Sequence, residues 1–331
     1  MIDSVEEHMN PTLFLAASLL LAPPTLAVVP VTAAQPVAAK GKPRAKPAAR
    51  VVKRGQTLRI TKGQRHVGNV MVLGGTLVIE DGAEVKGDVS LRQGSNLVVR
   101  RGSIHGVVSA KGARSVSLTK AKITGGNIEI EDTSKVIVSE STLQVSGGGL
   151  SFDDSSSVQL SDSSFEVTGG SVSFNDSSVV SLDDSKFSVT GGNIQVDGQS
   201  KLTLTDSSLT VTGGSVSFED STTTVANDSS IQVEGGNFTA GDSSKIETGK
   251  SRVTVTGGSV QLSDTSSIVQ KESDIDVEGG TVELSDESTM TLEDSSVTVE
   301  DGEVKQSPRS KLHKRGKSKV KKRAKKARRK K

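Results

Sequence analysis

Residues 187–214 decide the fold; they read FSVTGGNIQVDGQSKLTLTDSSLTVTGG and hold one full repeat of 22 residues. The glycine pair Gly191-Gly192 returns as Gly213-Gly214, and equivalent pairs recur at the same interval from Gly125 to Gly280. A fixed period of about 20–50 residues is the mark of a repeat architecture. The sequence therefore predicts a stack of similar units over residues 123–304.

Each repeat contains three short segments in which apolar residues alternate with polar ones. In the quoted repeat they are Phe187/Val189, Ile194/Val196 and Leu202/Leu204. Period-2 alternation is typical of strands with one buried face, and Gly, Asp and Ser between them favour turns. Three strands and three corners per repeat predict an all-β, single-stranded parallel β-solenoid (β-helix) with triangular coils. The crossover rule favours a right-handed winding.

The solenoid is expected to begin before the regular repeats, with coils of 19–20 residues. Their markers include Gly68-Asn69-Val70 and Gly87-Asp88-Val89, and strands are expected from Leu58. We expect a β-solenoid over residues 58–305, with 22-residue repeats from 123. This predicts about 11–12 coils and a length of roughly 50–55 Å at the usual strand spacing.

The corners of the repeats form columns of identical polar residues, which we expect at the surface. One serine column includes Ser163 and Ser185, a second includes Ser156 and Ser178, and an aspartate column that starts at Asp154 is interrupted by Gly198. Such side chains cap their own turns, and stacked carboxylates could alternatively form a cation-binding face.

Charge is strongly segregated behind a net value of +2. Residues 1–121 carry 17 basic and 7 acidic side chains, 122–305 carry 9 and 32, and 306–331 carry 15 basic and no acidic side chain. The seven Phe are accompanied by no Trp or Tyr, which argues against aromatic stacking on bases or sugars as a mode of recognition. With no cysteine, disulfides and thiolate metal sites are excluded.

The N-terminal region predicts export or membrane attachment. Residues 1–34 hold an uncharged apolar run and are expected to be a signal peptide or a membrane anchor, with membrane contact through residues 12–22. A Pro/Ala/Lys-rich linker is expected over 35–57. Export would place the protein outside the cell, in the periplasm or on the cell surface, whereas an anchor would leave it on the cytoplasmic face of the membrane.

Residues 306–331 are expected to be a disordered polybasic tail, because a dense block of like charges repels itself. Such a block, next to an acidic body, favours contact with an acidic polymer such as an envelope polysaccharide or a nucleic acid. The residues expected to bind it are Lys319, Lys321, Lys322, Arg323, Lys325, Lys326, Arg328, Arg329, Lys330 and Lys331. Self-association between the tail and the acidic body of a neighbour is also expected.

Nothing in the repeats predicts catalysis, a cofactor or a metal centre. His66 and His105 are expected at equivalent places in two early coils, without a surrounding frame of carboxylates or cysteines. A β-helical lyase or hydrolase would need paired carboxylates that interrupt the coil pattern. The sequence therefore indicates a non-enzymatic protein.

Two family resemblances follow from short motifs. The stretch from Gly74 to Val89, GGTLVIEDGAEVKGDV, resembles bactofilins, and the likeness covers residues 67–110. That resemblance implies a non-catalytic body that polymerises end to end without nucleotide. Residues 169–174, GGSVSF, are similar to repeats of β-helical surface adhesins, although no translocating outer-membrane barrel follows in this sequence.

Three functional hypotheses remain open on the sequence alone. The leading one is an exported structural scaffold, rigid and acidic, which its basic tail anchors to an acidic polymer. The second is a bactofilin-like cytoskeletal polymer at the membrane. The third is a surface adhesin that binds a receptor or glycan through a flank of the solenoid.

Overall fold

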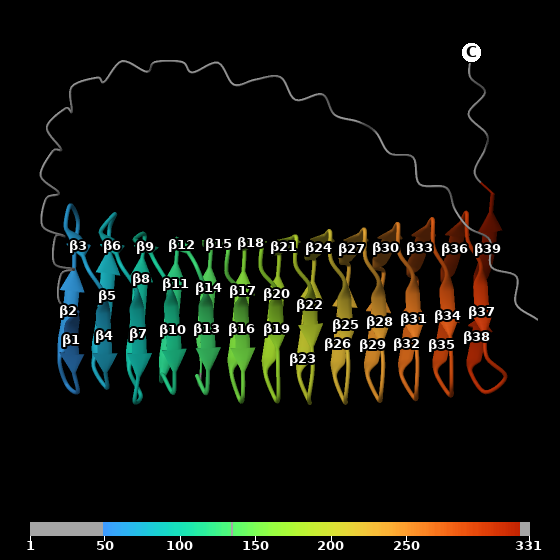
Figure 1. The fold of residues 1–331 in the computed structure, drawn as a ribbon, viewed down its shortest axis with the longest axis horizontal. Coiled ribbons are helices and arrows are strands. Elements are labelled where there is room, and N and C mark those ends of the chain that lie inside the picture. The colour runs from blue at the N-terminus through green and yellow to red at the C-terminus, as the bar shows by residue number, and fades with distance from the viewer. Residues whose placement is uncertain (1–48, 134, 325–331) are drawn as a thin grey trace, which may run out of the picture. The chain divides into compact units, whose positions relative to one another are not determined.

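A computed structural model describes residues 49–133 and 135–324. All the regular structure in this part of the chain is β-strand, arranged as three parallel sheets of 13 strands each. Successive strands lie in different sheets, and the chain returns to the same sheet once per coil (Figure 1). The predicted all-β parallel β-solenoid is therefore confirmed.

Sheet A contains the strands that follow the glycine-pair corner. They are β1 (Arg50–Lys53), β4 (Val70–Leu73), β7 (Val89–Arg92), β10 (Val108–Lys111), β13 (Ile128–Glu131), β16 (Leu150–Asp153), β19 (Val172–Phe174), β22 (Ile194–Val196), β25 (Val216–Phe218), β28 (Phe238–Ala240), β31 (Val260–Leu262), β34 (Val282–Leu284) and β37 (Val304–Gln306).

Sheet B comes second in each coil. Its strands are β2 (Thr57–Ile60), β5 (Thr76–Glu80), β8 (Asn96–Arg100), β11 (Ser115–Thr119), β14 (Val136–Ser139), β17 (Ser157–Ser161), β20 (Val179–Asp183), β23 (Lys201–Thr205), β26 (Thr223–Asn227), β29 (Lys245–Gly249), β32 (Ser267–Lys271), β35 (Thr289–Glu293) and β38 (Lys311–Arg315).

Sheet C completes each coil before the next glycine pair. Its strands are β3 (Arg65–Val67), β6 (Glu84–Lys86), β9 (Ser103–His105), β12 (Lys122–Gly125), β15 (Thr142–Ser146), β18 (Ser164–Thr168), β21 (Lys186–Thr190), β24 (Ser208–Thr212), β27 (Ser230–Glu234), β30 (Arg252–Thr256), β33 (Asp274–Glu278), β36 (Ser296–Glu300) and β39 (Lys319–Arg323).

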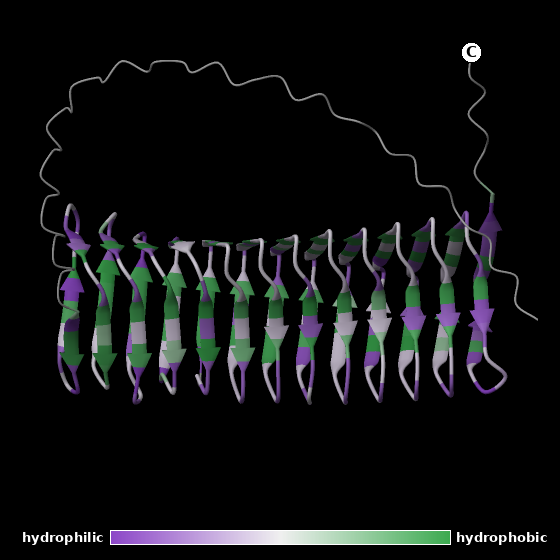
Figure 2. Ribbon diagram, viewed as in Figure 1, coloured by the Kyte–Doolittle hydropathy of each residue, from purple (hydrophilic) through white to green (hydrophobic). Residues whose placement is uncertain are grey.

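The register places each apolar column of the sequence on the inner face of one sheet. Phe187 pairs with Leu209 and Val189 with Val211, 22 residues along, and all four are at most 1% exposed. Side chains of neighbouring coils stack, and the rings of Phe152 and Phe174 lie 5.4 Å apart. Green apolar segments consequently recur from coil to coil along the solenoid in Figure 2. One continuous core results.

The two glycines of each pair have different roles. The first, for example Gly213, has φ +73, a left-handed conformation that glycine adopts without strain. The second glycine has no left-handed conformation and is required for lack of space: a Cβ on Gly214 would lie 2.0 Å from the carbonyl oxygen of Gly192 in the preceding coil. The pair therefore combines a turn with a close approach between stacked coils.

The solenoid is longer at both ends than the sequence predicted. β1 begins at Arg50, so residues 50–57 belong to the first coil and not to a linker. At the other end β37, β38 and β39 form a last coil within the expected tail, so disorder was a wrong prediction for most of residues 306–323. Twelve strand spacings give a length of about 58 Å. The predicted signal peptide or anchor over 1–34 lies outside the described residues.

Residues 49–133 and 135–324 contain no helix that is long and apolar enough to cross a bilayer. Residues 12–22, where membrane contact was expected, lie outside this part of the chain.

Candidate functional site

The last coil is a folded end of the solenoid. Val304, Leu312 and Val320, one from each strand, are partly buried and pack against the core. β38 pairs with β35, and β39 pairs with β36, along five residues each. These contacts overcome the mutual repulsion of the many charges in this segment.

This coil carries ten basic and no acidic side chains between residues 304 and 323. They are Lys305, Arg309, Lys311, Lys314, Arg315, Lys317, Lys319, Lys321, Lys322 and Arg323. Within the described residues two of them form ion pairs, Lys305 with Glu303 at 3.2 Å and Arg323 with Glu300 at 3.5 Å. The other eight form no ion pair among residues 49–133 and 135–324, and can meet an external anion.

Four of the predicted binding residues lie in β39. Lys319, Lys321 and Arg323 occupy outward positions, since their strand partners Ser296, Thr298 and Glu300 alternate with buried valines. Lys322 instead occupies the inward column, above Val299. The remaining predicted residues, Lys325, Lys326, Arg328, Arg329, Lys330 and Lys331, lie outside the described residues.

Sequence reasoning missed the basic residues of β37 and β38 as members of the site. Lys305, Lys311, Lys314 and Arg315 belong to the same folded coil as β39. The signal was present: Leu312 follows Met290 by 22 residues. The charge density of the segment masked that continuation of the repeat.

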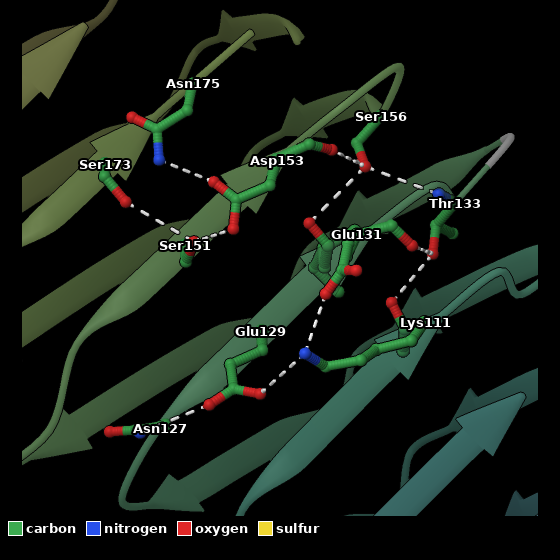
Figure 3. Close-up of polar contacts among 12 residues, drawn as sticks. Lys111, Asn127, Glu129, Glu131, Thr133, Ser151, Asp153, Ser156, Ser173 and Asn175 are labelled. Carbon is green, nitrogen blue, oxygen red and sulfur yellow. Dashed lines mark hydrogen bonds and ion pairs between the residues drawn. The ribbon is translucent and has the colours of Figure 1, made fainter. Parts of the chain in front are cut away.

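The charge of the body changes sign along its axis. Residues 49–126 hold 14 basic and 4 acidic side chains, 127–303 hold 7 and 32, and the last coil reverses the sign again. The first boundary is visible at Lys111 of β10, whose Nζ lies 2.7 Å from Glu131 and 4.0 Å from Glu129 of β13 (Figure 3). The carboxylate of Glu131 raises the pKa of Lys111.

Beyond that boundary the outer face of sheet A is an acidic and hydroxylated surface. Asp153 accepts hydrogen bonds from Ser151 at 2.5 Å and from Asn175 at 2.6 Å, and Ser173 donates to Ser151 (Figure 3). The network lies on two successive coils. It ties the coils together by side chains as well as by backbone hydrogen bonds.

The serine columns are buried, which corrects the expectation that they lie on the surface. Ser163 is 5% and Ser178 0% exposed. In the first column each serine hydroxyl accepts a hydrogen bond from the backbone N–H of the equivalent serine in the preceding coil; Ser185 accepts from Ser163 in this way at 3.2 Å. Each hydroxyl also donates to the carbonyl two residues before it in the chain, as Ser163 does to Ser161 at 2.7 Å. These serines hold the corners together and present no hydroxyl for binding.

The aspartate column caps backbone groups. Asp242 accepts from the N–H of Asp220 at 3.1 Å, and Asp264 accepts from that of Asp242 at 3.3 Å. The residues of this column have positive φ, near 50–60°, a conformation that Asp tolerates better than most residues. The column therefore has the structural role expected of turn residues.

Carboxylates crowd together at the corner between sheets A and B. The pKa of Asp197 is raised mainly by burial and, to a smaller extent, by the charges of Asp220 and Asp242. The pKa of Glu219 is likewise raised mainly by burial, with smaller effects from the charges of Asp197 and Asp242. Among the described residues, no group of three or more His, Asp or Glu side chains is arranged to hold a metal ion.

A long groove follows the corner between sheets B and C. It has a volume of about 900 Å³ and is lined by a ladder of acidic residues from successive coils, flanked by serines. The acidic ladder consists of Glu140, Asp162, Asp184, Asp206, Asp228 and Glu272. A basic residue, Lys250, interrupts it.

The two early histidines lie on opposite faces of sheet C. His66 pairs with Val85, which pairs with Ile104 in the inward column, whereas His105 pairs with Lys86 and contacts the hydroxyl of Thr124 at 2.6 Å. The expectation that His66 and His105 occupy equivalent positions was therefore wrong. Their positions differ by one residue, and in a strand a shift of one residue moves a side chain to the opposite face.

Comparison with protein families agrees with this geometry. The family model described as "Right handed beta helix region" matches residues 70–209. A mutant tailspike protein of E. coli bacteriophage HK620 is similar at 13% identity and a TM-score of 0.37, over 80% of this chain and 73% of that chain. No curated protein sequence matches the chain. The chain is thus similar to this family over residues 70–209, and its three parallel sheets have the architecture of a parallel β-helix.

Proposed function

We propose that this protein is a non-enzymatic, exported scaffold whose basic last coil attaches a rigid acidic rod to an acidic polymer. The single observation that carries the proposal is the concentration of ten basic and no acidic side chains in one folded coil at the end of an acidic body. Export is part of the proposal and rests on the apolar run in residues 1–34.

A folded coil suits polyanion binding better than a free tail. Its side chains project from strands that already have a fixed conformation, so little backbone entropy is lost on binding. Outward residues on one strand, such as Lys319 and Lys321, are about 7 Å apart, and neighbouring strands add further cations around the coil. Phosphate, sulfate and carboxylate groups on a linear polymer could contact several of them at once.

The acidic middle of the rod favours end-on binding. With 32 acidic and 7 basic side chains over residues 127–303, the flanks repel a polyanion. The polymer would therefore contact the last coil while the rod extends away from it.

The test is binding of fluorescein-labelled dextran sulfate to the full chain, followed by anisotropy over a series of salt concentrations. The variant Lys319→Gln/Lys321→Gln/Lys322→Gln/Arg323→Gln removes the charges of β39. We expect its affinity to fall by tenfold or more at low salt, and the slope of log affinity against log salt to become shallower by about 3–4, because fewer counterions are displaced.

The matched control removes four positive charges from exposed lysines of the acidic coils. Its substitutions are Lys186→Gln, Lys201→Gln, Lys250→Gln and Lys271→Gln. We expect this control to bind like the wild type. If both variants lose affinity equally, binding follows net charge and the last coil is not the site. A labelled single-stranded DNA of equal charge, run in parallel, distinguishes a preference for nucleic acid.

A second candidate function is adhesion through a flank, and the groove between sheets B and C favours it. This groove crosses at least six coils and offers carboxylates, together with the hydroxyls of the outer serines Ser164, Ser208 and Ser230, to a glycan or a basic receptor. Deleting residues 309–331 would abolish attachment to an acidic surface under the first proposal, whereas substitutions at Asp184 and Asp206 would abolish it under the second.

A further inference from the structure

Both ends of the solenoid break the apolar columns of its core. In the last coil, Lys314 pairs with Leu292 in sheet B and Lys322 pairs with Val299 in sheet C. Both apolar partners are completely buried, at 0% exposure. Lysine therefore occupies positions that belong to the core in the coil before.

The first coil shows the same feature. Arg50 pairs with Val70 in sheet A, and His66 pairs with Val85 in sheet C. Val70 is 1% and Val85 0% exposed. Arg50 is exposed and His66 is half-buried, with its Nε2 lacking a hydrogen-bond partner among the described residues.

These substitutions matter because the end strands would otherwise invite growth. An open strand edge above an apolar core is a template for another strand. Stacking a second copy on the last coil would bury the charges of Lys314 and Lys322 without partners, which is strongly unfavourable. It would also bring together two basic ends, since residues 49–69 of the first coil hold six basic and no acidic side chains.

We propose that Arg50, His66, Lys314 and Lys322 close both ends of the solenoid to a second copy of this chain, so that the protein does not polymerise end to end. This inference is independent of polyanion binding. It also predicts that the bactofilin-like hypothesis fails at its central property, end-to-end polymerisation.

The experiment converts the four inward positions to the residue types of their columns, in the full chain. The variant is Arg50→Val/His66→Val/Lys314→Leu/Lys322→Val. Light scattering after gel filtration measures particle mass, and negative-stain microscopy measures rod length. Both are run in about 0.5 M NaCl, where a Debye length of about 4 Å screens the outward charges and leaves the burial of inward charges as the main barrier.

A control variant removes charges from outward positions of the same strands: Lys53→Val, Arg65→Val, Lys311→Leu and Lys321→Val. We expect the wild type and this control to remain rods of about 58 Å, and the inward variant to form rods several times longer. Circular dichroism melting establishes that both variants are folded. Wild-type rods joined end to end would overturn the proposal, as would a folded inward variant that stays at single-rod length.

Discussion

Replacing Gln270 by leucine should stabilise the solenoid. Gln270 lies in an inward column of sheet B between Thr248 and Leu292, and it is 0% exposed. Neither its amide nitrogen nor its amide oxygen has a hydrogen-bond partner in the described part of the chain. Two coils earlier in the same column stands Ala226, preceded by Leu204, so leucine is compatible with the geometry of this position.

The magnitude follows from the cost of a buried amide. An unsatisfied polar group costs about 1–3 kcal/mol, and leucine has a volume close to that of glutamine. We therefore expect Gln270→Leu to raise the free energy of unfolding by about 2–3 kcal/mol. For a chain of this size that corresponds to a rise in melting temperature of about 3–5 °C.

The assay is urea unfolding followed by far-ultraviolet circular dichroism, because the chain has no Trp or Tyr to serve as a fluorescent probe. The midpoint should rise with an unchanged slope. The control is Gln159→Leu on the exposed face of β17, which should change stability by less than about 0.5 kcal/mol. An unchanged or lower midpoint for Gln270→Leu would show that the amide is satisfied, and would refute the reasoning.

Two further predictions concern the corners. Gly214→Ala should lower the urea midpoint more than Gly213→Ala. The new Cβ at position 214 would meet the carbonyl of Gly192, at a cost of about 3 kcal/mol or more, whereas alanine at position 213 would only have to adopt a left-handed conformation, at about 1–2 kcal/mol. Equal shifts of the two midpoints would contradict this. The pair Asp197→Asn/Glu219→Gln should raise the melting temperature by about 1–3 °C at pH 7. The fold raises the pKa values of both carboxyl groups, so their protonation stabilises the wild type below about pH 4, and this stabilisation is lost as the pH rises. Calorimetry should therefore find a smaller rise in melting temperature for the double variant at pH 4 than at pH 7. A rise that does not depend on pH would contradict this prediction.

The sequence predicted the body of the solenoid because the repeat encodes both the strands and their register. Once Val189 and Val211 are known to be equivalent, parallel stacking at that interval follows, and so does the inward column. The same argument predicted turns at the aspartate corners. These features depend on residues within one coil or its immediate neighbour.

The ends were not predicted, because there the two kinds of signal disagree. In residues 306–323 the charge pattern indicates disorder, while Leu312 and Val320 continue the apolar columns. Backbone pairing with β35 and β36, which carry Glu293 and Glu300 opposite Arg315 and Arg323, decides the outcome in favour of a coil.

The role of the second glycine could not be read from a single repeat either. Its need for a small residue arises from the carbonyl of the preceding coil, a contact between segments 22 residues apart. The burial of the serine columns has the same origin: Ser163 points toward a neighbouring coil and not toward solvent. Stacking converts residues typical of exposed turns into interior ones.

Hydrogen–deuterium exchange of residues 311–323, with and without dextran sulfate, tests the central claim most directly. The account predicts slow exchange for amides that β38 and β39 bond to the coil beneath, such as Lys311 to Ser288 and Lys319 to Ser295, and further slowing on adding the polymer. Exchange at the rate of an unstructured peptide, or slowing confined to residues 127–303, would contradict it.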